Sequence, residues 1–283
     1  MKKYYKERKG LLSNELALEL DDLLEFFSKT YHYYRNKNCF ECAIQGAYIV
    51  DKWTNEETQL YAPTLAPSPE VFFANHLQDK NVWPINEYVE DYTEEILFTV
   101  IEILYDHIGI YNFQIDVFEQ DKYREEFSEM INNILKMYDG GYYLEPSSGF
   151  IMRNPNQALR NQLQEDCSIL PDDVLLQLRT ATKMYYRYDS NFEEKKKAIN
   201  ILVDILENVR NDLKEVLSKE YEVNKNDHDK LIFNIVNSFN IRHNNDKQMT
   251  DYDKKIWYEW MMQYYSSVIL TYFKLIKTNK SIS

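Results

Sequence analysis

An arginine and a histidine stand next to each other in the run "FNIRHNN" at 239–245. An arginine can stabilise the negative charge that develops on a phosphodiester during cleavage, and a histidine can move protons near neutral pH. RNA supplies its own nucleophile, the 2′-hydroxyl, so such a site requires no metal ion. We therefore predict Arg242 and His243 as catalytic residues of a metal-independent endoribonuclease, with Asn244 and Asn245 holding the phosphate.

The same residues also fit the end of a helix. If the helix that carries Ile232, Val236 and Phe239 continues through this run, His243 extends its apolar stripe and Arg242 lies at the rim. Arginine and histidine are favoured at the negative end of a helix, and asparagine tolerates the left-handed turn that ends one. The pattern alone leaves both a catalytic site and a capping cluster open.

Two further groups could bind a metal or carry out redox chemistry. Cys39 and Cys42 have CxxC spacing, and His32 precedes them by seven residues. A structural zinc site needs four ligands, and the remaining cysteine, Cys167, has no paired neighbour, so we expect buried free thiols. A redox or metal role for Cys39 and Cys42 stays open.

A row of acidic residues, Glu95, Glu102 and Asp106, lies next to His107 at seven- and four-residue steps. On a helix this row forms either a carboxylate face for a metal or a solvated surface. The paired Glu-x-x-His motifs of di-metal bundles are missing, as are the P-loop, the dinucleotide fingerprint, GxSxG and HExxH. We therefore predict no metal and no cofactor.

The composition predicts the elements that must position these residues. The 283 residues include only 6 glycines and 7 prolines, which favours long helices over a sandwich or barrel. The net charge of −13 argues against non-specific binding to nucleic acid. The segment 1–10, MKKYYKERKG, is basic and carries two tyrosines that could stack on bases, although a solvated terminus is the ordinary expectation. No secretory signal and no apolar run of membrane-spanning length is found, which predicts a cytoplasmic protein with no membrane partner.

Hydrophobic periodicity predicts a mainly α-helical protein with multi-helix bundle architecture and one small β-hairpin near 142–152. We expect an N-terminal helical region at 1–140, a hairpin or linker at 141–153, and a C-terminal helical bundle at 154–283. The expected N-terminal helices are 13–29, one after Ser68, 86–107 and 113–138. The expected C-terminal helices are 154–166, one after Pro171, 192–221, one around 231–239, and 250–277.

The last predicted helix is rich in aromatic residues. Trp257, Trp260, Tyr264 and Tyr265 fall close together along it, and large aromatic side chains are enriched in protein interfaces. They predict an interface for a second copy of the chain or for another protein. A non-enzymatic interaction or regulatory module is therefore the alternative to a protein that acts on RNA.

The C-terminal bundle with its "FNIRHNN" run resembles the HEPN-type helical domains of bacterial abortive-infection, toxin–antitoxin and prophage defence proteins. The resemblance covers residues 150–283 at most. It implies action on RNA, either as a metal-independent endoribonuclease or as a degenerate RNA-binding form, with a homodimer and a phage trigger as expected partners. The family's signature is arginine, four to six residues, then histidine, and none of the arginines in this chain has a histidine at that spacing.

Overall fold

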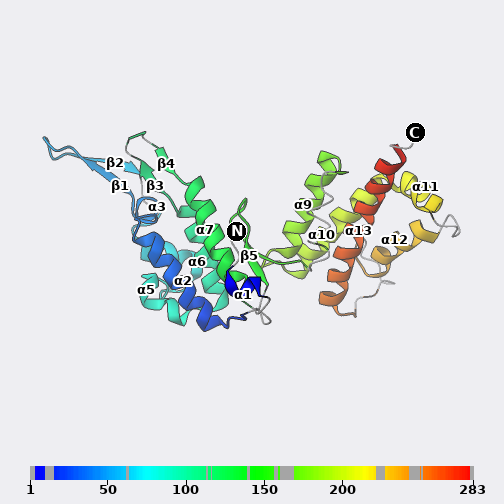
Figure 1. Ribbon diagram of the computed structural model, residues 1–283, viewed down its shortest axis with the longest axis horizontal. Helices are drawn as coiled ribbons and strands as arrows, with labels where there is room; N and C mark the ends of the chain where they lie inside the picture. The colour runs from blue at the N-terminus through cyan, green and yellow to red at the C-terminus, as the bar shows by residue number, and fades with distance from the viewer. Residues whose placement is uncertain are drawn as a thin grey trace. The chain divides into compact units, whose positions relative to one another are not determined.

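The computed structural model describes two compact units, Met1–Arg153 and Asn154–Ser283 (Figure 1). The structure describes residues 4–9, 16–61, 64–112, 114–115, 117–138, 141–155, 159, 169–220, 227–241, 249 and 251–280. The predicted mainly helical fold with a hairpin near 142–152 is confirmed. No described helix is long and apolar enough to cross a membrane.

The first unit combines helices with short antiparallel strand pairs. Its helices are α1 Tyr5–Arg8, α2 Leu20–Arg35, α3 Glu41–Gln45, α4 Pro69–Leu77, α5 Ile85–Tyr88, η1 Val89–Asp91, α6 Glu94–His107 and α7 Asp121–Leu135. Its strands are β1 Ala47–Val50, β2 Glu57–Tyr61, β3 Ile110–Asn112, β4 Val117–Glu119, β5 Tyr142–Leu144 and β6 Ile151–Arg153, paired in order as three two-stranded sheets. The helix predicted after Ser68 is confirmed as α4, and the Ser68 hydroxyl caps it by accepting a hydrogen bond from the Val71 N–H at 3.4 Å.

The β5–β6 hairpin is fastened to the first unit by side chains of α6 and α7. The Asn132 side chain both donates to the Leu144 carbonyl, at 2.9 Å, and accepts from the Leu144 N–H, at 2.7 Å. The Glu102 carboxylate accepts a hydrogen bond from the Ile151 N–H at 2.7 Å. These contacts satisfy strand groups that have no partner within a two-stranded sheet, so the hairpin is part of the first unit.

Three predicted helices of the first unit are wrong at their N-terminal ends. The helix expected from 13 begins at Leu20, because the main chain at Leu18 instead pairs with Met137, at 2.7 Å. The helix expected at 86–107 is divided, because Thr93 caps a new start at Glu94. The helix expected at 113–138 begins at Asp121, since residues 117–119 within that range form strand β4, which pairs with β3.

The second unit is built around α10, which packs against both α9 and α13. Its helices are α9 Asp172–Tyr186, α10 Phe192–Asn208, α11 Arg210–Glu220, α12 Asp227–Ser238 and α13 Lys254–Lys280. Apolar residues of α10 at steps of three and four, among them Ile199, Leu202 and Leu206, are fully buried. The sequence therefore places the core of this unit on the inward faces of α9, α10 and α13.

Two predicted helix boundaries of the second unit also differ. The helix expected at 192–221 is divided at Val209 into α10 and α11. The last helix begins at Lys254, where the Asp253 carboxylate accepts hydrogen bonds from Lys255 N–H (3.0 Å) and Ile256 N–H (3.2 Å). Thr250, where the last helix was expected to begin, and most of the helix expected at 154–166 lie outside the described residues.

Candidate functional site

The end of α12 settles how far that helix extends towards the Arg–His pair. Asn240 has a left-handed backbone with φ of 53°. The N–H of Ile241 then bonds back to the Val236 carbonyl at 3.2 Å, as in a Schellman cap, and the Ile241 side chain is buried. The α12 helix therefore ends before Ile241, so the condition under which His243 would extend its apolar stripe is not met.

The four residues predicted to cleave and bind RNA lie outside the described residues. They are Arg242, His243, Asn244 and Asn245. Their roles stay predictions. The described residues on either side of this run, Asn240 and Met249, both line one pocket.

This pocket lies in the second unit and has a volume of about 190 Å³. It is formed by the first turns of α10 and α13 together with the end of α12 and the chain that precedes α13. Its lining residues are Glu193, Lys196, Asn240, Met249, Tyr252, Lys254 and Tyr258. At about 30 Å³ per water molecule, it has room for about six waters, which matches a small polar group and not a whole nucleotide.

The lining of the pocket carries more positive than negative charge. Lys196 and Lys254 contribute two ammonium groups and Glu193 one carboxylate. Among the described residues neither lysine forms an ion pair. The Lys254 ammonium lies 5.9 Å from the centre of the Phe192 ring. Both lysines are half-buried, and an anionic group that enters the pocket can bind them without first breaking an ion pair.

Two tyrosines add neutral hydrogen-bonding groups to the same pocket. The Tyr252 hydroxyl donates to the Phe239 carbonyl at 2.6 Å, and the Tyr258 hydroxyl is hydrogen-bonded to that of Tyr252. Burial raises the pKa of both phenols, and for Tyr258 the hydrogen bond to Tyr252 and the nearby charge of Glu193 raise the pKa further. Both hydroxyls therefore remain protonated at neutral pH.

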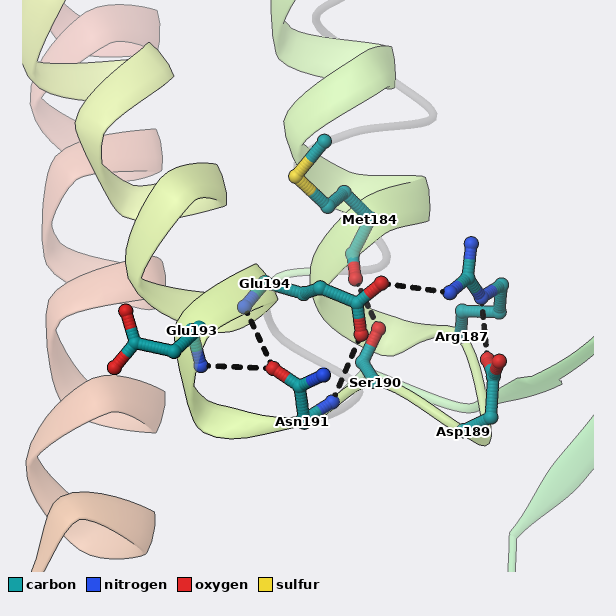
Figure 2. A network of polar contacts seen from close by, with 7 residues as sticks. All are labelled: Met184, Arg187, Asp189, Ser190, Asn191, Glu193 and Glu194. Carbon is teal, nitrogen blue, oxygen red and sulfur yellow. Dashed lines mark hydrogen bonds and ion pairs between the residues drawn. The ribbon is translucent and has the colours of Figure 1, made fainter.

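The start of α10 is held in place by a polar network (Figure 2). The Asn191 side chain accepts hydrogen bonds from the N–H groups of Glu193 (2.9 Å) and Glu194 (3.0 Å), and Glu194 in turn accepts from the Asn191 N–H at 3.0 Å. Arg187, at the end of α9, donates to Glu194 at 2.9 Å. This capping box fixes the helical turn that carries Glu193 and Lys196.

A row of aromatic side chains lies beside the pocket. We call Phe239, Trp257, Trp260 and Tyr264 the aromatic strip. Its ring centres are 4.7 Å apart between Phe239 and Trp257, 5.5 Å between the two tryptophans, and 5.2 Å between Trp260 and Tyr264, whose rings are stacked. Trp257 is 38% exposed and Trp260 is 40% exposed, so both rings present surface to solvent.

Phe239 connects the aromatic strip with the pocket. Its ring contacts Trp257 of the strip and also Tyr252 of the pocket lining, with centres 5.0 Å apart. On α13, Lys254 and Tyr258 line the pocket, and Trp257 follows on the adjacent side of the helix. A single ligand can therefore contact both surfaces.

Tyr265, predicted to be part of an aromatic interface, lies instead in the core. Its side chain has no exposed surface, and its hydroxyl donates to the Ile232 carbonyl at 2.8 Å. Its neighbour Tyr264 is half-buried within the aromatic strip. Successive side chains on a helix point about 100° apart, so Tyr264 lies at the surface of α13 and Tyr265 in the core.

The charge of the chain is distributed unevenly between the two units. Residues 1–153 hold 14 lysines and arginines against 27 aspartates and glutamates, a net charge of −13. Residues 154–283 hold 19 of each, a net charge of 0. The argument from overall charge against nucleic-acid binding therefore applies to the first unit and not to the second.

In the acidic row Glu95, Glu102 and Asp106 of the first unit, the middle residue has a structural role. Glu102 accepts a hydrogen bond from the β6 strand, whereas Glu95 and Asp106 are exposed. Burial lowers the pKa of His107, whose ring contacts Phe72. No group of three or more metal-binding side chains is found among the residues that the structure describes.

Cys39 and Cys42 are free and buried, whereas Cys167 lies outside the described residues. Burial raises the pKa of the Cys39 thiol to about 11 and also raises that of Cys42. In a Cys167→Ser variant we expect Ellman's reagent at pH 7.5 to react with these two thiols at least tenfold more slowly in the folded than in the denaturant-unfolded protein. Equal rates in the two states would contradict the buried positions.

The pocket was not predicted from the sequence. Lys196 and Lys254 are far apart in the chain and stand in ordinary charged runs, EEKKK and DYDKK. The signals present were local: Asn191 with Glu194 three residues later as a capping box, and Asn240 as a residue that tolerates the left-handed backbone.

Comparison of the chain with family models, with curated proteins and with solved structures finds no match.

Proposed function

We propose that the C-terminal unit binds single-stranded RNA. The observation that carries the proposal is the aromatic strip, with Trp257 and Trp260 exposed, next to a pocket lined by Lys196 and Lys254. Proteins that bind single strands combine aromatic side chains, on which bases stack, with positive groups that contact phosphates. The second unit presents both kinds of group on adjacent surfaces.

A single strand fits this surface better than a duplex. Bases can stack on an aromatic side chain only when their faces are free, and in a duplex those faces are covered by neighbouring bases. Trp257 and Trp260 lie on one helix with ring centres 5.5 Å apart and nearly perpendicular planes. Such rings can hold bases that are turned away from one another, as in an unpaired strand.

Cleavage of the bound strand by Arg242 and His243 is the second part of the proposal. His243 takes the proton of a 2′-hydroxyl, and the 2′-oxygen bonds to phosphorus. The bond from phosphorus to the 5′-oxygen breaks while that oxygen takes up a proton from a water molecule. The products are a 2′,3′-cyclic phosphate and a 5′-hydroxyl. Arg242 stabilises the charge on the phosphate oxygens. Both residues follow Asn240 of the pocket within three positions of the sequence.

The proposal is tested with the full-length chain and a labelled RNA of about twelve nucleotides. We expect fluorescence anisotropy to detect binding of the single strand and much weaker binding of the matching duplex. In gels, we expect His243→Ala to slow cleavage about 100-fold or more, the usual effect of losing a general base, with His228→Ala as the control. If the RNA is bound but not cleaved, the cleavage part of the proposal is wrong and only RNA binding remains. If neither the single strand nor the duplex binds, the whole proposal is overturned.

Self-association through the same surface is the second candidate. Ile256, which precedes Trp257, is 64% exposed, and a large apolar side chain beside two tryptophans favours a protein interface. Sedimentation of the wild-type chain and of a Trp257→Ala, Trp260→Ala variant distinguishes the two. A dimer that the double substitution converts to a monomer would assign the aromatic strip to self-association.

A further inference from the structure

The pocket in the second unit has the features of a binding site for one phosphate group. Its two lysines come from different helices, Lys196 from α10 and Lys254 from α13, and are brought to a common cavity of about 190 Å³. Lysine binds phosphate as a point charge, and two lysines suit the double negative charge of a phosphate monoester. The Glu193 carboxylate also lines the pocket, so the three charged groups leave a net charge of +1.

Asn240 supplies a second, independent observation. Its Oδ1 atom is inaccessible to solvent and has no hydrogen-bond partner among the described residues. A buried acceptor without a partner costs free energy, which a hydroxyl group of a ligand would relieve. Because phosphate oxygens are mainly acceptors, the hydroxyl belongs to the group next to the phosphate. In RNA with a 3′-phosphate, that neighbour is the 2′-hydroxyl of the same ribose.

The size and surroundings of the pocket indicate what lies beyond the phosphate. The cavity holds a phosphate and a few atoms more, so the base and the rest of the strand must remain outside. Phe239, the residue before Asn240, leads from the pocket to Trp257, on which a base can stack. The pocket opens to solvent on one side, so a phosphate at the end of a strand can enter it while the rest of the strand stays outside.

We propose that this pocket binds the 3′-terminal phosphate of a single-stranded RNA, with Lys196 and Lys254 on the phosphate and Asn240 on the adjacent 2′-hydroxyl. The inference rests on the proposed RNA binding and specifies which part of the strand is recognised. The pocket then holds the kind of end that cleavage through a 2′-hydroxyl leaves once the cyclic phosphate has opened.

The experiment measures the affinity of the full-length chain for labelled six-nucleotide strands by fluorescence anisotropy. The strands carry a 3′-phosphate, a 5′-phosphate or no terminal phosphate, and a DNA strand with a 3′-phosphate is added. We expect the RNA with a 3′-phosphate to bind about tenfold more tightly than the other three. Inorganic phosphate and a nucleoside 3′-monophosphate serve as unlabelled competitors.

Matched variants assign the effect to the pocket. We expect Lys196→Gln and Lys254→Gln each to remove most of the roughly tenfold preference for the 3′-phosphate. Their exposed neighbours provide the controls Lys197→Gln and Lys255→Gln, which should keep it. Asn240→Gly preserves the left-handed backbone without the amide, so it should lose the preference for RNA over DNA while the protein stays folded.

The outcomes separate this inference from the proposed function. If all RNA strands bind equally, and Lys196→Gln behaves like Lys197→Gln, then the pocket assignment is overturned while RNA binding stands. If the nucleoside 3′-monophosphate binds as tightly as the strand, the pocket serves a free nucleotide and the strand end is excluded. If no RNA binds, both proposals fail together.

Discussion

Replacing both Trp257 and Trp260 by alanine is expected to weaken the binding of single-stranded RNA by about 100-fold. Base–aromatic stacking contributes about 1–3 kcal/mol for each base, so the loss of two platforms corresponds to about two orders of magnitude or more. Both side chains are partly exposed, at 38% and 40%, so alanine leaves no buried cavity at either position. Fluorescence anisotropy with a labelled strand gives the affinity, and thermal unfolding verifies that the variant is folded.

The chain provides a matched control in the first unit. Trp53, in the turn between β1 and β2, is 96% exposed. Removing it tests whether any exposed tryptophan contributes to RNA binding. We expect Trp53→Ala to bind RNA like the wild-type chain. An equal loss of affinity in the control and in the Trp257, Trp260 variant would contradict the role of the aromatic strip.

Tyr265→Ala is expected to lower the free energy of unfolding by about 3–5 kcal/mol, the usual effect of removing a buried aromatic side chain. Tyr265 is fully buried, and its hydroxyl bonds to the Ile232 carbonyl of α12, so the substitution leaves a cavity and removes that hydrogen bond. Tyr264→Ala, one residue earlier on the aromatic strip, is expected to cost less than half as much because its side chain is only half-buried.

Denaturant unfolding followed by circular dichroism measures both variants. Tyr265→Phe provides the third measurement, because it removes only the hydroxyl and should cost about 1 kcal/mol. If Tyr264→Ala destabilises the chain as much as Tyr265→Ala, then the division of α13 into a core side and a surface side is incorrect.

The helical class and the β5–β6 hairpin could be predicted because both depend on local patterns. Apolar residues at steps of three and four predict α10, and the Pro146–Gly149 turn between β-prone runs predicts the hairpin. Helix ends were less predictable because they depend on partners elsewhere. Leu18 is not helical since its main chain pairs with Met137, which lies over a hundred residues further along the chain.

The candidate site shows the same division between local and distant information. Trp257 and Trp260 were selected as interface residues from their type and their position on one predicted helix, and the structure shows that both are exposed. Lys196 and Lys254 could not be recognised, because only the packing of α10 against α13 brings them to one pocket. The apolar stripe of α12 could not be followed to His243, because the left-handed residue Asn240 ends the helix.

The concentration of negative charge in the first unit affects how RNA binding depends on ionic strength. RNA that approaches the second unit is repelled at long range by the −13 charge of the first, whatever the arrangement of the two. Salt screens that repulsion over a Debye length of about 10 Å at 0.1 M and at the same time weakens the contacts between lysines and phosphates. The two effects oppose each other, so affinity falls less steeply with salt than the number of phosphate contacts alone implies. Stacking on the aromatic strip, which carries no charge, then contributes a larger share of the binding.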